Sequence, residues 1–194
     1  MFRKSFKYEY YVIVFKKEQG TMKRLLLIPF LLLAACTQSG YDTTKEIEMI
    51  DTAGDKVGTA TLSEQPEGVR IKLKLDGIAP GVHAIHVHEF PKCEQPDFTS
   101  AGEHFNPDGK EHGKMNSKGP HLGDLPNIEA DAAGKVDVEL MLAEATLMDG
   151  KQSLVRDKGT SLIVHESQDD GYSQPSGNSG ARILCGKITA DKKE

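Results

Sequence analysis

The chain has 194 residues, of which 38% are hydrophobic and 6% aromatic, enough for one globular domain of moderate size with some tail. Its formal net charge is −5, and no cluster of lysines and arginines forms a basic stripe, so the sequence argues against nucleic acid as a partner. Nineteen glycines and no tryptophan favour a loop-rich β domain over a helical one.

The N-terminal region carries the pattern of an export signal. Lys23 and Arg24 precede an apolar run that ends in small residues before Cys36, and the run is too short to span a bilayer. It resembles a bacterial lipoprotein signal, in which the cysteine becomes the acylated first residue of the mature protein. We therefore expect a signal peptide over residues 22–35, lipidation of Cys36, a polar tether over residues 36–45, and an extracytoplasmic protein anchored to a bacterial cell membrane.

The segment before that signal has no clean helical or strand period. Residues 1–21 mix aromatic residues with lysines, and we interpret them as an extension from a misassigned start, with Met22 as the true start. A genuine extended n-region of the signal is the alternative. At the other end, residues 191–194 form a charged tail, which leaves residues 46–190 for the folded domain.

Two further cysteines, Cys93 and Cys185, remain in the domain. An even pair in an exported chain favours a disulfide over a thiol site. The bridge would close a loop of about ninety residues, and the loop-entropy model gives roughly 4 to 5 kcal/mol for such a closure.

The domain alternates between short strand patterns and two long polar loops. Apolar and polar residues alternate in a strand-like way, and the loops are longer than compact domains usually carry without a function. We predict an all-β sandwich or barrel with two long functional loops. The expected strands are 46–50, 56–62, 69–75, 82–88, 135–140, 161–165 and 182–188, and the expected loops are 89–127 and 166–181.

Histidines gather on one predicted strand and in the loop that follows it. Residues two apart in a strand share a face, so His86 and His88 form a pair of imidazoles, whereas His83 has the opposite parity and is expected to face inward as a hydrogen-bonding residue. Neutral imidazole suits copper and zinc, and a carboxylate suits zinc better than copper. The other candidate ligands are His104, His112, His121, Asp124 and His165.

Four ordered motifs resemble the copper/zinc superoxide dismutase family. They are GVHAIHVHEF at residues 81–90, SAGEHFNP at 100–107, HLGDLPN at 121–127 and GNSGARILCG at 177–186. The resemblance covers essentially all of residues 46–190. It implies a Greek-key β-barrel or sandwich of about eight antiparallel strands, with a homodimer as the assembly to be tested.

The resemblance also implies two metal sites that share one ligand. Copper would be held by His86, His88, His104 and His165. Zinc would be held by His104, His112, His121 and Asp124. The shared His104 would have to be an imidazolate, because only that form binds one metal through each ring nitrogen. Asp169 would link His86 to His112 from outside both sites, and the disulfide would join Cys93 of the metal loop to Cys185 of a late strand.

The activity implied is the dismutation of superoxide to oxygen and hydrogen peroxide. Copper would supply the redox step, zinc would hold the geometry, His104 would deliver a proton, and Arg182 would attract and orient the superoxide anion. Two departures from familiar animal enzymes leave the dimer mode and the steering residues open. Residues 93–104 form a longer stretch, as in bacterial variants, and residues 166–181 form a shorter loop without a Glu/Lys cluster.

The sequence leaves one main alternative to an enzyme that protects the cell envelope from superoxide. A non-catalytic copper- or zinc-binding lipoprotein could use the same fold, because fold does not fix function. The full ligand set and Arg182 argue against it. A zinc-only protein or hydrolase is weaker still, because no spare carboxylate stands beside an open zinc position.

Overall fold

The computed structural model describes residues 43–190. The predictions for residues 1–21, for the signal peptide, for Cys36, for the tether up to residue 42 and for the tail at 191–194 lie outside these residues. Across the part that is described, no helix has the length and apolar character needed to cross a membrane.

The first three strands form an antiparallel meander. They are β1 (Thr44–Asp51), β2 (Lys56–Gln65) and β3 (Gly68–Asp76). The period of two seen in the sequence decides which face is buried: Ile47 and Met49 of β1 are buried, while Glu46 and Glu48, which alternate with them, are exposed. Burial of alternate apolar residues therefore fixes the register of these strands.

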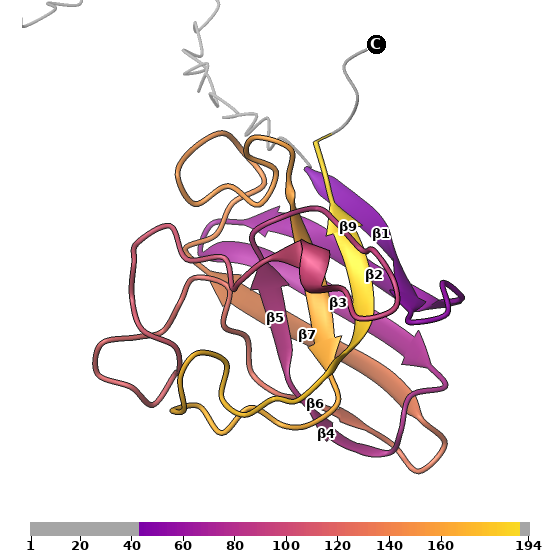
Figure 1. Ribbon diagram of the computed structural model, residues 1–194. Coiled ribbons are helices and arrows are strands. Elements are labelled where there is room, and N and C mark those ends of the chain that lie inside the picture. The colour runs from indigo at the N-terminus through magenta and orange to yellow at the C-terminus, as the bar shows by residue number, and fades with distance from the viewer. Residues whose placement is uncertain (1–42, 191–194) are drawn as a thin grey trace, which may run out of the picture. The chain divides into compact units, whose positions relative to one another are not determined.

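A seven-stranded sheet in the order β5-β8-β9-β1-β2-β3-β7 makes up most of the domain. All of its pairings are antiparallel, and neighbours such as β1 with β9 and β3 with β7 are far apart in the sequence, which is the Greek-key pattern. The sheet curls into a half-barrel around the core (Figure 1). Its other strands are β5 (Ile85–His88), β7 (Lys135–Ala143), β8 (Thr160–His165) and β9 (Arg182–Ile188).

The predicted strand 82–88 is divided at Ala84. Its first part, β4 (Gly81–His83), pairs with β6 (Ile128–Ala130) in a separate two-stranded sheet, whereas β5 pairs with β8. At the division, the Ala84 N–H donates to the Ser167 carbonyl at 2.8 Å, and the Ala84 carbonyl accepts from the His165 N–H at 2.9 Å. Tertiary contacts thus divide an apolar run that looked continuous. β6 is a strand that the sequence did not predict.

One large apolar cluster fills the half-barrel, with contributions from the strands and from the connection between β7 and β8. Met49, Ile71 and Leu162 are completely buried in it, and Leu154 of that connection adds to it. Burial of such side chains is the main stabilising contribution to a fold of this kind.

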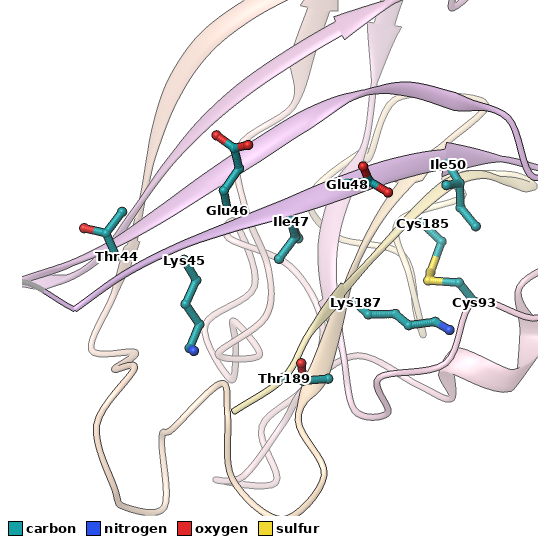
Figure 2. A pocket seen from close by; sticks show the side chains of 10 residues that line it. All are labelled: Thr44, Lys45, Glu46, Ile47, Glu48, Ile50, Cys93, Cys185, Lys187 and Thr189. Atoms are coloured by element: carbon teal, nitrogen blue, oxygen red, sulfur yellow. A yellow bond between two sulfur atoms is a disulfide. The ribbon is translucent and has the colours of Figure 1, made fainter. Parts of the chain in front are cut away.

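The predicted disulfide between Cys93 and Cys185 is present, with a sequence separation of 92. It lies in a second small apolar cluster with Phe98, Ala101 and Ile163. Figure 2 shows the disulfide beside a cavity of about 520 Å³ between β1 and β9. No histidine lines that cavity, so it is separate from the candidate metal ligands.

The two long loops have the predicted bounds. Residues 89–127 connect β5 to β6 and contain only the short 3-10 helix η1 (Thr99–Ala101), and residues 166–181 connect β8 to β9. We call them the metal loop and the second loop. A main-chain hydrogen bond from the Met115 N–H to the Gly171 carbonyl, at 3.1 Å, joins the two loops.

Candidate metal centre

The centre is built on β5, where every side chain is buried. Ile85 and Val87 belong to the apolar core, and His86 and His88 project together from the other face because strand residues alternate between faces. His83 is also buried, with Nδ1 at 2.9 Å from the His165 carbonyl and Nε2 at 2.8 Å from the Ala79 carbonyl. Both of its ring nitrogens already have partners, which fits a structural role.

The metal loop is fixed to β5 by main-chain hydrogen bonds around Val87. Its carbonyl accepts from the Phe105 N–H at 2.8 Å, and its N–H donates to the Gly123 carbonyl at 2.9 Å. A Cβ at Gly123 would lie 2.3 Å from the Val87 carbonyl oxygen, so only glycine allows this approach. As a result, His104 lies opposite His88 and Asp124 lies opposite His86.

Two groups of potential ligands meet at His86 and His104, and within each group one ligand atom per residue lies within 4.8 Å of all the others. The first group contains His86, His88, His104 and His165. The second contains His86, His104, His112 and Asp124. The first equals the set expected for copper. The second holds three of the four residues expected for zinc.

His121, the fourth residue expected for zinc, borders the second group. Its Nδ1 lies 3.4 Å from Asp124 Oδ1 and 3.4 Å from His104 Nδ1. The structure therefore brings His121 next to the other three residues of the predicted zinc set. His86, which stands in both groups, also belongs to the predicted copper set.

The copper group leaves four buried ring nitrogens without hydrogen-bond partners. On the outer side, His86 Nε2 lies 2.9 Å from Asp169 Oδ2, His88 Nδ1 lies 2.9 Å from the Gly102 carbonyl, and His165 Nδ1 lies 3.1 Å from Ser179 Oγ. A buried polar atom without a partner costs about 1–3 kcal/mol, so four of them in one group are costly unless a ligand binds them. Four imidazole nitrogens suit copper. The partnerless atoms are His86 Nδ1, His88 Nε2, His104 Nε2 and His165 Nε2.

His104 is the side chain whose two ring nitrogens serve the two groups. Its Nε2 is one of the partnerless atoms, and its Nδ1 lies 2.8 Å from Asp124 Oδ1. Its ring centroid is 4.0 Å from that of His86 and 5.1 Å from that of His112. This position fits an imidazole that binds a metal through each nitrogen.

Asp124 gathers the donors of the second group. Its Oδ2 accepts from the Gly113 N–H at 2.9 Å and the His121 N–H at 3.0 Å, and it lies 3.1 Å from His112 Nδ1. Burial favours the neutral acid, but the contacts with His104, His112 and His121 outweigh it and hold the pKa of Asp124 well below its usual range. A carboxylate that stays ionised among imidazoles suits zinc.

Burial keeps several of these imidazoles neutral in the absence of metal. It lowers the pKa of His104 to about 4 and that of His165 to about 3, because a buried site disfavours the charged ring. For His112, burial acts in the same direction, but the hydrogen bonds to Asp124 and Asp169 prevail and raise its pKa to about 9. A neutral imidazole is the form that binds one metal, so His165 need lose no proton to do so at neutral pH. His104 would still have to lose its remaining ring proton to bind a metal through each nitrogen.

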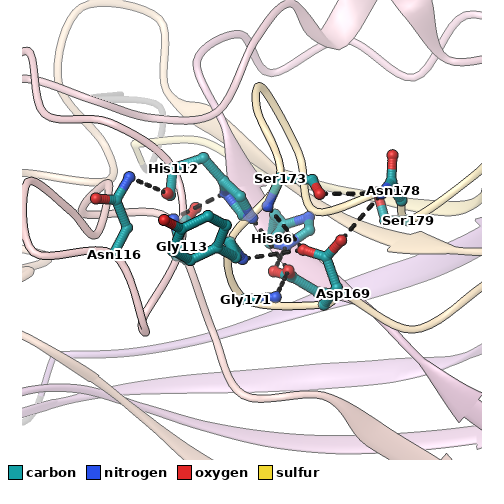
Figure 3. A network of polar contacts seen from close by, with 12 residues as sticks. His86, His112, Gly113, Asn116, Asp169, Gly171, Ser173, Asn178 and Ser179 are labelled. Carbon is teal, nitrogen blue, oxygen red and sulfur yellow. Dashed lines mark hydrogen bonds and ion pairs between the residues drawn. The ribbon is translucent and has the colours of Figure 1, made fainter.

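Asp169 joins the two groups from the second loop, as Figure 3 shows. Its Oδ2 lies 2.9 Å from His86 Nε2 and its Oδ1 lies 3.0 Å from His112 Nε2. Asn127 holds the main chain of Asp169 in both directions, donating to its carbonyl and accepting from its N–H at 2.9 Å each. The carboxylate is thus fixed between an imidazole of each predicted metal site.

Arg182, the first residue of β9, is held by two carbonyl oxygens of the metal loop. Its guanidinium donates to the Phe98 carbonyl and to the Gly102 carbonyl, at 2.8 Å each. The same Gly102 carbonyl contacts His88 Nδ1, and Arg182 pairs with His165 across the sheet. These contacts place a cation beside two residues of the copper group.

Sequence reasoning did not single out the side chains that support the centre from outside. Asn127 and Ser179 lie inside motifs that identified the family resemblance, so the motifs carried a signal that was not used. Gln174, which contacts the main chain of His112, had no such signal. In the sequence, a polar residue whose side chain contacts another loop cannot be distinguished from one whose side chain faces solvent.

The comparisons agree with this geometry. The family model described as copper/zinc superoxide dismutase matches residues 56–188. A "Superoxide dismutase [Cu-Zn] 2" of Aquifex aeolicus is 44% identical over 171 residues, covering 86% of this chain and 99% of the relative. The "Superoxide dismutase-like protein YojM" of Bacillus subtilis is 40% identical over 151 residues, or 76% and 77% of the two chains.

A solved structure extends the similarity to three dimensions. The copper/zinc superoxide dismutase of Brucella abortus superposes with a TM-score of 0.64 at 31% identity, covering 75% of this chain and 99% of that one. The similarity in fold therefore extends over three quarters of this chain and nearly all of that one.

Proposed function

The chain belongs to the copper/zinc superoxide dismutase family, and from this premise we propose that it removes superoxide outside the cytoplasm and so protects the cell envelope. As a member of that family it is an enzyme that converts two superoxide anions and two protons to oxygen and hydrogen peroxide, with copper and zinc as its cofactors. The location, the anchor and the assignment of each ligand belong to the proposal.

We assign the two metals to the two groups of side chains. Copper is held by His86, His88, His104 and His165, and the observation that carries this assignment is their set of buried, partnerless ring nitrogens. Zinc is held by His104, His112, His121 and Asp124, which provide three imidazoles and an ionised carboxylate. When bound, copper supplies the one-electron redox chemistry, and zinc fixes the geometry without redox chemistry of its own.

The protein's own residues supply charge and protons. The guanidinium of Arg182 is fixed in place by two carbonyl oxygens, so it attracts superoxide and orients it without having to reorganise. With Nδ1 directed to the zinc group, His104 would be able to hold a proton at Nε2, on the copper side. That position allows His104 to deliver a proton to the product.

The proposed location rests on the sequence and on the disulfide. Disulfides persist in oxidising compartments, and the bridge between Cys93 and Cys185 belongs to the folded domain. Residues 22–35 have the pattern of a lipoprotein signal that ends before Cys36. Radiolabelled fatty acid should enter the native protein and not C36A, and C36A should no longer partition with membranes. Membrane partition of C36A with its signal segment retained would refute the anchor.

The activity is tested with the soluble C36A form loaded with both metals. Superoxide consumption and metal content should both be high, and H104A should lose most of the activity together with the coupling of copper to zinc. H83A is the control, because both ring nitrogens of His83 bind main-chain carbonyls; it should lower stability more than copper content. Equal loss of copper from H104A and H83A at unchanged stability would contradict the assignment.

The second candidate is a non-catalytic metal-binding lipoprotein on the same fold. The relative described as superoxide dismutase-like, at 40% identity, is the observation that keeps it in consideration. This candidate predicts full copper and zinc content with no superoxide consumption.

Sedimentation of the metal-loaded C36A form tests whether the protein is a homodimer.

A further inference from the structure

The second loop contacts both the imidazole ring and the main chain of His112. At the ring, Nε2 lies 3.0 Å from Asp169 Oδ1. At the main chain, the His112 N–H donates to Gln174 Oε1 at 2.9 Å, and Gln174 Nε2 donates back to the His112 carbonyl at 2.9 Å. Gln174 Nε2 also lies 3.1 Å from the Tyr172 carbonyl in its own loop.

The position of His112 needs such support because its part of the metal loop has no apolar anchor. The core clusters include Phe105 and Leu125, with Leu122 packed against them, but no residue from 106 to 121. Within the metal loop, Asn116 Nδ2 donates to the His112 carbonyl at 3.1 Å, four residues away. Asp108 Oδ1 accepts from Lys151 Nζ at 2.6 Å at one end of this segment, and around His112 the contacts with other parts of the fold cross to the second loop.

The side-chain amide of Gln174 forms hydrogen bonds with both the N–H and the carbonyl of His112. One side-chain amide that accepts from an N–H and donates to the carbonyl of the same residue fixes both peptide planes on either side of the Cα. Those planes direct the Cα–Cβ bond and hence the ring. In the structure, the ring then lies with Nδ1 at 3.1 Å from Asp124 Oδ2 and Nε2 toward Asp169.

We propose that Gln174 is a positioning residue for the zinc side of the centre: it locks the main chain of His112 to the second loop and so fixes the direction in which the imidazole meets zinc. This inference rests on the proposed role of His112 as a zinc ligand. Outer contacts of this kind commonly change metal affinity 10- to 100-fold when removed.

The test uses zinc-free protein that carries one equivalent of copper(I), titrated with cobalt(II) as a coloured probe of the zinc position. Q174M keeps the length of the side chain and removes both hydrogen bonds between residue 174 and the main chain of His112. We expect its cobalt affinity to fall roughly 10-fold and its visible absorption bands to shift, because these bands report ligand geometry. Gln174 is exposed, so the substitution leaves the core intact, and thermal unfolding of the metal-free protein checks this.

Three further variants make the test specific. Q168M places the same change on an exposed residue of the same loop and should keep wild-type affinity and spectrum. Q174E keeps an acceptor for the His112 N–H but has no N–H to donate, so its affinity should lie between those of wild type and Q174M. Hydrogen exchange of metal-free Q174M should be faster in both loops, whereas N116L should accelerate exchange in the metal loop only.

The outcomes separate this proposal from the proposed function. Wild-type affinity and spectrum in Q174M, or an equal loss in Q168M, would overturn the role of Gln174 while leaving the zinc assignment intact. A wild-type protein that binds no cobalt beside copper would overturn the zinc assignment and the role of Gln174 together.

Discussion

Gly177 and Asp169 approach so closely that a Cβ at Gly177 would lie 1.8 Å from Asp169 Oδ1 and 2.8 Å from His112 Nε2. A methyl group there would displace the carboxylate from His112. We expect G177A to release zinc to a chelator at least 10-fold faster than wild type, in line with the loss of an outer contact.

G109A is the matched control for that substitution. Gly109 has the same φ of +66 as Gly177, but nothing lies within 4 Å of its Cβ position. Both variants place an alanine at the same positive φ, and the clash is present in G177A alone. Equal zinc release from the two variants would show that the clash with Asp169 is unimportant.

Replacing Asp169 should separate the two halves of the centre. D169N removes the charge that faces His86 and His112, and we expect zinc affinity to fall 10- to 100-fold by calorimetric titration. D170N is the control, because Asp170 accepts from Tyr172, Ser173 and Asn178 within its own loop. A loss of affinity in D170N as large as in D169N would mean that loop order alone is responsible.

Removing the disulfide should destabilise the fold and loosen the metal loop first. The bridge ties Cys93, near the start of that loop, to β9. For C93S/C185S we expect a decrease of about 2–5 kcal/mol in the free energy of unfolding, measured by urea denaturation of metal-free protein. Amide exchange should rise most around residues 93–104. An unchanged free energy of unfolding would contradict this account.

The metal-free protein should lose stability as the pH falls below about 6.5. Burial lowers the pKa of His104 to about 4 and that of His165 to about 3, so the unfolded chain binds protons that the folded one does not. Each group should then cost up to about 1.4 kcal/mol per pH unit between pH 6.5 and its folded pKa. Urea denaturation at pH 7, 6 and 5 measures the slope.

H165Q tests whether that slope comes from the buried histidines. Glutamine does not titrate, so the dependence between pH 7 and pH 5 should be shallower than in wild type. His112 acts in the opposite sense: its pKa is raised to about 9, so its stabilisation is complete below pH 6.5 and is lost as the pH rises toward 9. Identical slopes for H165Q and wild type would rule out His165 as a source.

Local periodicity predicted most of the fold. The alternation of Ile47 and Met49 with Glu46 and Glu48 was enough to find β1, because burial of one face leaves a period of two in the sequence. The same reasoning overextended the strand at 82–88. Whether the chain continues in one sheet or crosses to another depends on what Ala84 contacts, and those contacts come from residues 165 and 167.

By itself, the sequence predicted the kind of chemistry, because imidazole and carboxylate groups are the donors that suit copper and zinc and four motifs carried the family resemblance. It also placed His86 and His88 on one face, since strand geometry is local. Only the tertiary structure decided which ring nitrogens remain partnerless, that Asp169 reaches both His86 and His112, and that Gln174 holds the main chain of His112. The contacts of His112 with Asp169 and Gln174 join two loops that are separated by residues 128–165 in the chain, and such closeness in space leaves no periodic pattern in either loop.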